Sequence, residues 1–191
     1  MDGHSKLTPE REGEIYETVM RLVGEHGYDR LTVQQITTAT RASTATLYRR
    51  WNGKARLVVE ALRHAMPPPL SGIDTGSLHG DFVEGARRMA EVSERYASVM
   101  SALAHASRTD PDLHEAVNDV LITPITEATH HILDRATARG EVAAAAPGRE
   151  FIPELLLGSI LARRAVTGRS VDEEFLARFV DTVILPVIGV H

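Results

Sequence analysis

The sequence contains no cysteine among its 191 residues. Disulfides, thiolate metal sites and cysteine nucleophiles are therefore excluded, and the composition suits a reducing compartment. Aromatic residues are scarce as well, at 5%, with a single tryptophan. No uninterrupted apolar run approaches the roughly 20 residues that a membrane-spanning helix needs. The N-terminal stretch also lacks the apolar core of a signal peptide. We therefore expect a soluble, cytoplasmic protein that does not associate with a membrane.

Motifs for several kinds of chemistry are also missing. There is no glycine-rich phosphate loop and no Gly-x-Ser-x-Gly nucleophile motif. His114 is followed four residues later by Asn118 rather than by a second histidine, so a zinc-protease helix would lack a ligand. His130 and His131 are adjacent, and adjacent helical residues diverge by about 100°, so they cannot easily share one ion. The sequence thus predicts no metal site, no cofactor and no enzymatic activity.

What the sequence does contain is an uneven distribution of charge. Residues 1–66 carry 10 Lys and Arg against 8 Asp and Glu, whereas residues 67–191 carry 11 against 18, within a net charge of −5. Seven basic residues and one acidic residue, Glu60, lie between Arg30 and His64. An acidic protein binds nucleic acid only if its positive charge is gathered on one surface. The basic segment is the candidate for that surface, although basic side chains that only solvate helices would give the same count.

The first two helices are marked by their ends. Thr8 and Pro9 open a helix as N-cap and first helical residue, and Gly27 is placed to end it in a left-handed C-cap. Thr32 and Gln35 form a capping box, which predicts the start of a short second helix.

A third helix is expected directly after the second. Ser43 is its N-cap, and Leu47 and Trp51 lie four residues apart on the face that would pack against the earlier helices. Asn52 and Gly53 break this helix. A fourth helix then begins at Lys54 and ends before the proline run that starts at Pro67.

The rest of the chain is also helical in pattern. Residues 67–80 are rich in Pro, Gly and Ser and predict a loop between domains. The later helices are expected at about residues 81–107, from 111, at 123–140, at 149–167 and at 172–187. Without any alternating strand pattern or internal repeat, the prediction is an all-α fold of about nine helices. Its domains are a helix-turn-helix domain at 1–66, which includes the start of the connecting fourth helix, and a helical domain at 67–191.

Three short motifs in the basic segment resemble one known family. Thr32-Val33-Gln34-Gln35-Ile36, Ser43-x-x-Thr46-Leu47-Tyr48-x-x-Trp51 and Lys54-x-x-Leu57 resemble the DNA-binding domain of TetR-type (TetR/AcrR) transcriptional repressors. The resemblance covers about the first 66 residues. The remainder is similar only in length, helical class and its two long C-terminal helices. The resemblance implies a homodimer that binds a palindromic operator in double-stranded DNA through its helix-turn-helix units. It also implies release of the DNA when a small-molecule effector binds the C-terminal domain.

The resemblance also implies the DNA contacts. Thr32 and Tyr48 match family positions that contact backbone phosphates. Lys54 matches a third such position, where the N-terminus of the fourth helix also favours a phosphate. Small residues at 44–46 allow close approach to base edges. Capping alone is the alternative role of Thr32 and Ser43. The predicted DNA-binding residues are Thr32, Arg41, Ser43, Thr44, Ala45, Thr46, Tyr48, Arg49 and Lys54.

The turn before the third helix departs from the family pattern. The usual turn is Ala-Gly-Val-Ser, whereas this chain has Thr40-Arg41-Ala42-Ser43. If residue 41 keeps a left-handed conformation, arginine is strained there by roughly 1 kcal/mol relative to glycine. The same arginine would add a cation near DNA.

Two further sites are expected in the C-terminal part. Apolar, aromatic and histidine side chains suit a cavity for an apolar small-molecule effector, although each of them also fits an ordinary core. The last two long helices could pair with their symmetry mates as a four-helix bundle. The predicted pocket residues are Tyr96, Met100, Leu103, Ile125, His131 and Phe151, and the predicted dimer residues are Leu157, Gly158, Leu161, Phe175, Phe179 and Val183.

Two other classes of protein stay open on the sequence alone. One is a helical adaptor whose basic patch binds an acidic protein. The other is an all-α enzyme, for which no carboxylate or nucleophile constellation can be argued from residue spacing. The choice between repression and activation is open as well.

Overall fold

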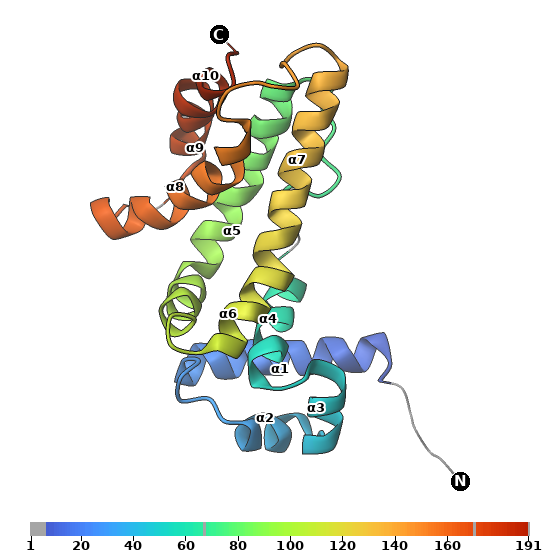
Figure 1. Ribbon diagram of the computed structural model, residues 1–191. Helices are drawn as coiled ribbons and strands as arrows, with labels where there is room; N and C mark the ends of the chain where they lie inside the picture. The colour runs from blue at the N-terminus through green and yellow to red at the C-terminus, as the bar shows by residue number, and fades with distance from the viewer. Residues whose placement is uncertain (1–6, 67, 170, 191) are drawn as a thin grey trace. The chain divides into compact units, whose positions relative to one another are not determined.

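A computed structural model describes residues 7–66, 68–169 and 171–190 (Figure 1). The described residues form helices and loops without any strand, which confirms the predicted all-α class. The chain divides into two compact units, one of Met1–Pro67 with Ser98–Ile122 and one of Pro68–Ala97 with Thr123–His191. Residues 1–6 and Pro67, the first residue of the predicted proline-rich loop, lie outside the described residues.

The first unit begins with α1 (Pro9–His26). The Thr8 hydroxyl accepts the backbone N–H of Arg11, which confirms the predicted N-cap. Ile15, Val19 and Leu22 are among the side chains that this helix buries. Gly27 ends the helix at φ 75° but ψ 160°, so the predicted left-handed cap is wrong in detail. The backbone turns there into an extended loop rather than into a left-handed turn.

Besides α2 (Val33–Thr40), α3 (Thr44–Trp51) and the last part of α5 (Leu78–Ala106), this unit contains three further helical segments. They are α4 (Lys54–Ala65), α6 (Pro111–Val117) and the π-helical turn η1 (Asn118–Ile122). Asp110 caps α6 by accepting the backbone N–H of Leu113, and its carboxylate also accepts the hydroxyl of the buried Tyr28 at 2.7 Å. Burial and this neighbouring carboxylate raise the pKa of Tyr28. The hydrogen bond joins the loop after α1 to the start of α6.

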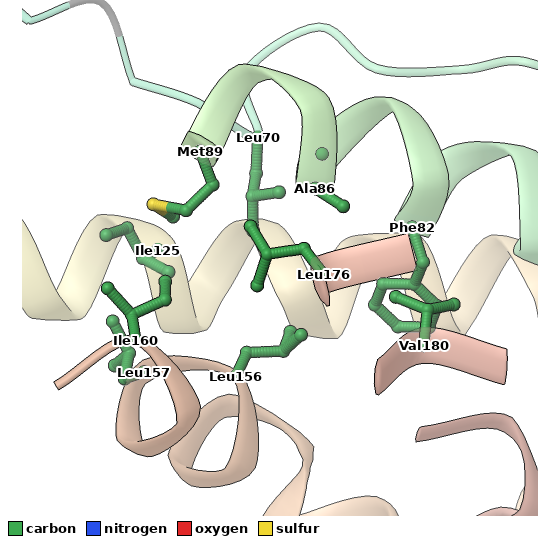
Figure 2. A pocket seen from close by; sticks show the side chains of 11 residues that line it. Leu70, Phe82, Ala86, Met89, Ile125, Leu156, Leu157, Ile160, Leu176 and Val180 are labelled. Atoms are coloured by element: carbon green, nitrogen blue, oxygen red, sulfur yellow. The ribbon is translucent and has the colours of Figure 1, made fainter. Parts of the chain in front are cut away.

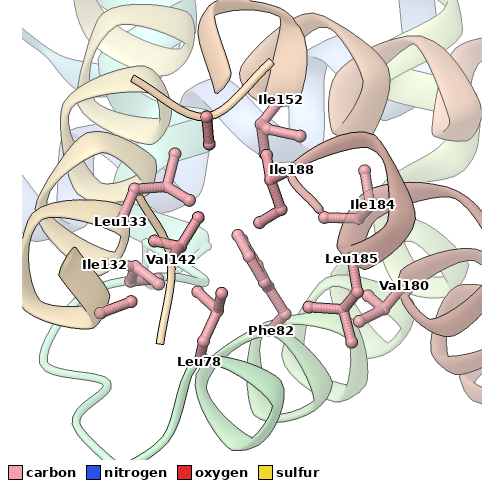
Figure 3. Close-up of a cluster of buried hydrophobic side chains, with 12 residues drawn as sticks. Leu78, Phe82, Ile132, Leu133, Val142, Ile152, Val180, Ile184, Leu185 and Ile188 are labelled. Carbon is pink, nitrogen blue, oxygen red and sulfur yellow. The ribbon is translucent and has the colours of Figure 1, made fainter. Parts of the chain in front are cut away.

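The second unit contains the first part of α5 (Leu78–Ala106) and the helices that follow η1. Figure 3 shows its core, where Leu78 and Phe82 from α5 meet Leu133, Ile152 and Ile184. Burial of these side chains away from water is the main source of stability for such a helical layer. The later elements are α7 (Thr123–Ala138), η2 (Arg149–Phe151), α8 (Ile152–Thr167), α9 (Glu173–Phe179), η3 (Val180–Ile184) and α10 (Leu185–Val187).

The helix ends agree closely with the sequence pattern, but the helix interiors do not. The helix expected at 81–107 spans Leu78–Ala106, and Gly140 follows α7 with φ 78°. The final helix expected at 172–187 is interrupted by η3, a π-helical turn. Such turns change the backbone hydrogen bonds from i−4 to i−5 partners and have no sequence signature of their own.

A buried carboxylate fastens the loop before α5. Asp81 has no exposed surface and accepts the backbone N–H and the hydroxyl of Thr75, at 2.7 and 2.8 Å, and a guanidinium N–H of Arg135 at 3.1 Å. Burial alone would raise the pKa of Asp81, but these hydrogen bonds outweigh it and hold the pKa below its usual value. The charged form of Asp81 therefore stabilises the second unit.

Asp81→Asn is expected to lower the free energy of unfolding at neutral pH by about 2–3 kcal/mol, because it leaves Arg135 without its buried partner. In the wild type this stabilisation is complete above the unfolded-state pKa of about 3.9 and is lost as the pH falls through the lower folded-state pKa. Chemical denaturation between neutral and acidic pH measures both effects. Asp74→Asn is the matched control, since Asp74 lies 3.7 Å from Arg135 but is mostly exposed. An equal loss in both variants would contradict the role of Asp81.

Candidate nucleic-acid interface

Two short helices in the first unit carry the basic segment: α2 (Val33–Thr40) and α3 (Thr44–Trp51). At the start of α2, the Thr32 hydroxyl accepts the backbone N–H of Gln35, and the Gln35 side chain accepts the backbone N–H of Thr32 at 2.8 Å. At the start of α3, the Ser43 hydroxyl accepts the backbone N–H of Thr46 at 3.0 Å. Both predicted caps are confirmed, and they fix where each helix begins.

The turn between the two helices contains a left-handed arginine. Arg41 has φ 52° and ψ 29°, so the backbone keeps the conformation in which the family pattern places glycine. Thr40 before it is buried, and its carbonyl oxygen accepts the guanidinium of Arg11. The turn is therefore tight and is tied to α1.

The inner face of α3 is fixed by its two largest apolar residues. Leu47 and Trp51 are each 1% exposed, as predicted for core residues. The indole N–H of Trp51 donates to the hydroxyl of Tyr16 at 3.1 Å, and that hydroxyl donates to Glu60 at the same distance. Burial raises the pKa of Tyr16, so this hydroxyl keeps its proton as a donor. The hydrogen bonds and the packing together set the rotation of α3 about its own axis.

Arg50 contributes to the same positioning. Its guanidinium donates two hydrogen bonds to Glu12 in α1, at 2.5 and 3.2 Å. These hydrogen bonds raise the pKa of Arg50, which stays charged. The two residues are 38 positions apart in sequence, and no local pattern pairs them. Arg50 thus acts within the chain, like Arg11 in the turn.

The outer face of α3 is left to solvent. Thr44, Ala45, Tyr48 and Arg49 are exposed, and Tyr48 is the largest of them at 51% exposure. Thr46 is half-buried and shares a hydrogen bond of 2.8 Å with Ser43. A face of hydroxyl, methyl, phenol and guanidinium groups can approach phosphates and base edges.

Lys54 is held differently from the other predicted contacts. Its ammonium donates to the carbonyl oxygen of Tyr28 at 3.2 Å and lies 4.0 Å from the centre of the Tyr28 ring. Part of the ammonium's hydrogen-bonding capacity is therefore used inside the unit. The other predicted contacts outside α3, which are Thr32, Arg41 and Ser43, are all exposed.

Leu47 and Trp51 were predicted to position α3, but their partners on α1 were not identified from the sequence. No role was predicted for Arg11, Glu12 or Tyr16 in positioning this helix. These residues could be recognised only by knowing that α1 packs against the buried Trp51. That in turn requires knowing how α1 crosses α3. Position in the sequence alone does not supply it.

A cavity lies in the second unit (Figure 2). The space between its walls is about 420 Å³, and part of that space is open to solvent. Figure 2 shows side chains from α5, α7, α8 and α9 converging on it. All lining side chains are hydrocarbon apart from the Met89 thioether and Gly85: Leu70, Phe82, Gly85, Ala86, Met89, Ile125, Leu156, Leu157, Ile160, Leu176 and Val180.

Of the six predicted pocket residues, only Ile125 lines this cavity. Leu103 is buried in the first unit, and Met100 belongs to that unit as well. Phe151 is 56% exposed and His131 is also exposed. Tyr96 is half-buried on α5, away from the lining.

The predicted dimer residues are divided between surface and core. Gly158 and Leu161 are exposed on α8, the latter by 55%, whereas Leu157 lines the cavity. Phe175, Phe179 and Val183 are half-buried. Val166, which was not predicted, is 80% exposed at the end of α8. Exposed apolar side chains on one helix are typical of a surface that another protein covers.

No cluster of three potential metal ligands occurs within residues 7–66, 68–169 and 171–190. In the same described parts of the chain, no helix has the length and apolar character needed to cross a membrane.

Two stretches of the chain match descriptions of known families. Residues 15–61 match "Bacterial regulatory proteins, tetR family", and residues 73–183 match "Tetracyclin repressor-like, C-terminal domain". The second match alone covers more than half of the chain.

Relatives and solved structures agree with these matches. An uncharacterized HTH-type transcriptional regulator of Mycobacterium tuberculosis is 35% identical over 92% of this chain and 87% of its own. The DNA-binding transcriptional repressor TetR of Mycobacteroides abscessus is 29% identical over 93% and 94%. Among crystal structures, the TetR family transcription regulator SCO0332 is similar in fold with a TM-score of 0.75 at 23% identity, over 95% and 99% of the two chains. AibR in complex with isovaleryl coenzyme A and operator DNA has a TM-score of 0.55 at 20% identity, over 95% and 100%. The chain therefore belongs to the TetR family of DNA-binding, helix-turn-helix transcriptional regulators.

Proposed function

We propose that this regulator is a homodimeric repressor that binds a palindromic operator and is released from it by an apolar small molecule. The observation that carries the proposal is the exposed face of α3. Its inner face is fixed by Leu47 and Trp51. The side chains of Thr44, Tyr48 and Arg49 make no hydrogen bond or ion pair with the described residues. A rigid helix with a free polar face is what insertion into a major groove requires. The functional division is a DNA-binding domain at 1–66 and an effector and dimerisation domain at 67–191.

The cations of the basic segment divide into two groups. Arg50 pairs with Glu12, and Arg56 donates to Glu60 and Asp119 at 3.0 and 3.3 Å. Arg41 and Arg49, in contrast, have no ion pair among the described residues. Free cations contribute to phosphate binding by releasing counterions from DNA, whereas paired ones contribute less. The proposed contacts are therefore Thr32, Arg41, Ser43, Thr44, Ala45, Thr46, Tyr48 and Arg49, with Lys54 as a contact that must also keep its position over Tyr28.

The dimer is proposed to form through α8 and the helices that follow it. Leu161 and Val166 are large apolar side chains that are mostly exposed. Gly158 precedes them on the same helix, and a Cβ atom at this position would meet no other atom within 4 Å. A glycine on an exposed apolar helix lets a second helix approach closely. A two-fold axis through this surface would pair each helix with its own copy.

The effector is proposed to place a hydrocarbon portion in the cavity of the second unit. A charged group inside that lining would lose its hydration without gaining a hydrogen bond, which costs several kcal/mol. The lining contains only carbon side chains and the Met89 thioether. The solved complex of AibR with isovaleryl coenzyme A supports an effector with a short branched hydrocarbon group in a protein of this fold.

Tyr48→Ala is expected to weaken binding to the operator by roughly ten- to hundredfold, since each good polar contact to DNA is worth about 1–3 kcal/mol. The duplex is first selected by the wild-type protein from a random-sequence library, and affinities are then measured by fluorescence anisotropy. Tyr48→Phe is the matched control: it keeps the ring and loses only the hydroxyl, so it separates packing on DNA from hydrogen bonding. A library that yields no enriched duplex would contradict the proposed function, and unchanged affinity in both variants would contradict the placement of Tyr48.

A further inference from the structure

Arg41 occupies a backbone conformation that arginine avoids. Among the residues that the structure describes, Arg41 and Asn52 are the two non-glycine residues with positive φ. Asparagine tolerates the left-handed region because its short amide can hydrogen-bond locally. Arginine has no such compensation, and its Cβ is too close to the following carbonyl oxygen. The turn between α2 and α3 is therefore strained at Arg41, whereas the end of α3 is not strained at Asn52.

No contact within the chain offsets this strain. The Arg41 side chain is exposed and has no hydrogen bond or ion pair among the described residues. The other nearby arginines are used internally: Arg11 holds the Thr40 carbonyl oxygen, and Arg50 holds Glu12. Strained residues that persist without an internal reason are found mainly at functional sites.

The basic segment around Arg41 offers its guanidinium no free carboxylate. The basic segment contains a single carboxylate, Glu60, which already accepts the hydroxyl of Tyr16 and the guanidinium of Arg56. Arg41 therefore has no anion to pair with in its own segment. It lies two residues before Ser43, the cap of the exposed α3. An external anion next to α3 is the complement that this side chain lacks.

We propose that Arg41 binds a DNA phosphate beside the groove that α3 enters, and that the chain keeps a strained turn to hold this cation there. The inference rests on the proposed function, because it assumes that α3 docks on DNA. It goes further in assigning to one residue opposite effects on folding and on binding. The contact is to the phosphate backbone, so it strengthens binding to every sequence and does not choose among bases.

Arg41→Gly separates the two effects cleanly. Glycine adopts the same left-handed conformation without strain, so the turn stays as it is and only the side chain is lost. The melting temperature is expected to rise by about 2–4 °C. Affinity for the selected duplex is expected to fall by about tenfold or more at low salt, since a hydrogen bond to a charged group is lost in each subunit. The slope of log K against log salt is expected to become shallower by about two for a dimer.

Three companion variants complete the experiment, all made in the full chain. Arg41→Lys is expected to keep the salt slope and the melting temperature of the wild type, because it keeps both charge and strain. Arg41→Ala is expected to lose affinity without any gain in melting temperature, because alanine is also strained at positive φ. Arg63→Ala removes an exposed cation in the last turn of α4, nine residues beyond Lys54, and is expected to leave the slope unchanged.

Affinity is measured on the selected duplex and on a scrambled duplex of the same composition. Equal weakening on both duplexes in Arg41→Gly supports the phosphate contact. Weakening on the selected duplex alone would overturn it, since that result identifies a base contact. A wild-type slope in Arg41→Gly would also overturn it while leaving the proposed function intact. Failure of the wild type to prefer the selected duplex would instead overturn the proposed function itself.

Discussion

Trp51→Ala is expected to lower the free energy of unfolding by about 3–5 kcal/mol, the usual cost of removing a large aromatic side chain from a core. Trp51 is 1% exposed and packs edge-on against Tyr16 with ring centres 5.9 Å apart. Its loss opens a cavity under α3 and removes the donor to the Tyr16 hydroxyl. Because α3 carries the proposed DNA contacts, DNA binding is expected to be lost together with stability.

The stability of this variant is measured by circular dichroism during urea denaturation, since Trp51 is the only tryptophan and its fluorescence disappears with it. Trp51→Phe is the matched control. It keeps most of the ring volume and loses the indole N–H, so its expected cost is smaller, about 1–2 kcal/mol. Wild-type stability in Trp51→Ala would mean that α3 does not depend on this side chain for its position.

Leu161→Glu is expected to weaken the proposed dimer by a hundredfold or more, which corresponds to about 3 kcal/mol. The side chain is 55% exposed on α8, so the substitution harms the folded chain little by itself. In a two-fold interface, however, each subunit contributes one glutamate, and both charges would be buried without partners. DNA affinity is expected to fall as well, because two linked reading helices bind more tightly than one.

Analytical ultracentrifugation over a range of concentrations measures this change in dimer dissociation. Ala138→Glu introduces the same charge at an exposed position at the end of α7 and is expected to leave the dimer unchanged. Leu161→Ala, which removes apolar surface without adding charge, is expected to be intermediate. A Leu161→Glu protein that stays dimeric at the same concentrations as the wild type would exclude this face of α8 as the interface.

The sequence predicted best what depends on neighbouring residues. Thr8, Thr32 with Gln35, and Ser43 cap their helices as expected, because a cap is formed within three residues of the helix start. Leu47 and Trp51 are buried as their spacing predicted. Even the left-handed turn at Arg41 could be anticipated from the family resemblance.

What the sequence did not predict depends on contacts between distant segments. Arg50 is one of the seven basic residues of the basic segment, and its pairing with Glu12 on a separate helix has no signal in the sequence. The cavity wall joins Leu70, Ile125 and Leu176, which come from three separate segments, and their apolar character is the same as that of core residues. Phe151 was expected inside a long helix, but it lies in the short η2 and is largely exposed.

The composition of the cavity wall bears on how this regulator can change over generations. A wall of carbon side chains contains no buried polar group that a substitution could leave unsatisfied, so exchanging Ala86, Ile160 or Leu156 for another apolar residue changes size and shape only. Such a pocket separates ligands that differ by one methylene by only about 10- to 200-fold. For the proposed effector site, a single substitution is therefore enough to shift specificity to a new hydrocarbon, and the changed protein still responds in part to closely related hydrocarbons.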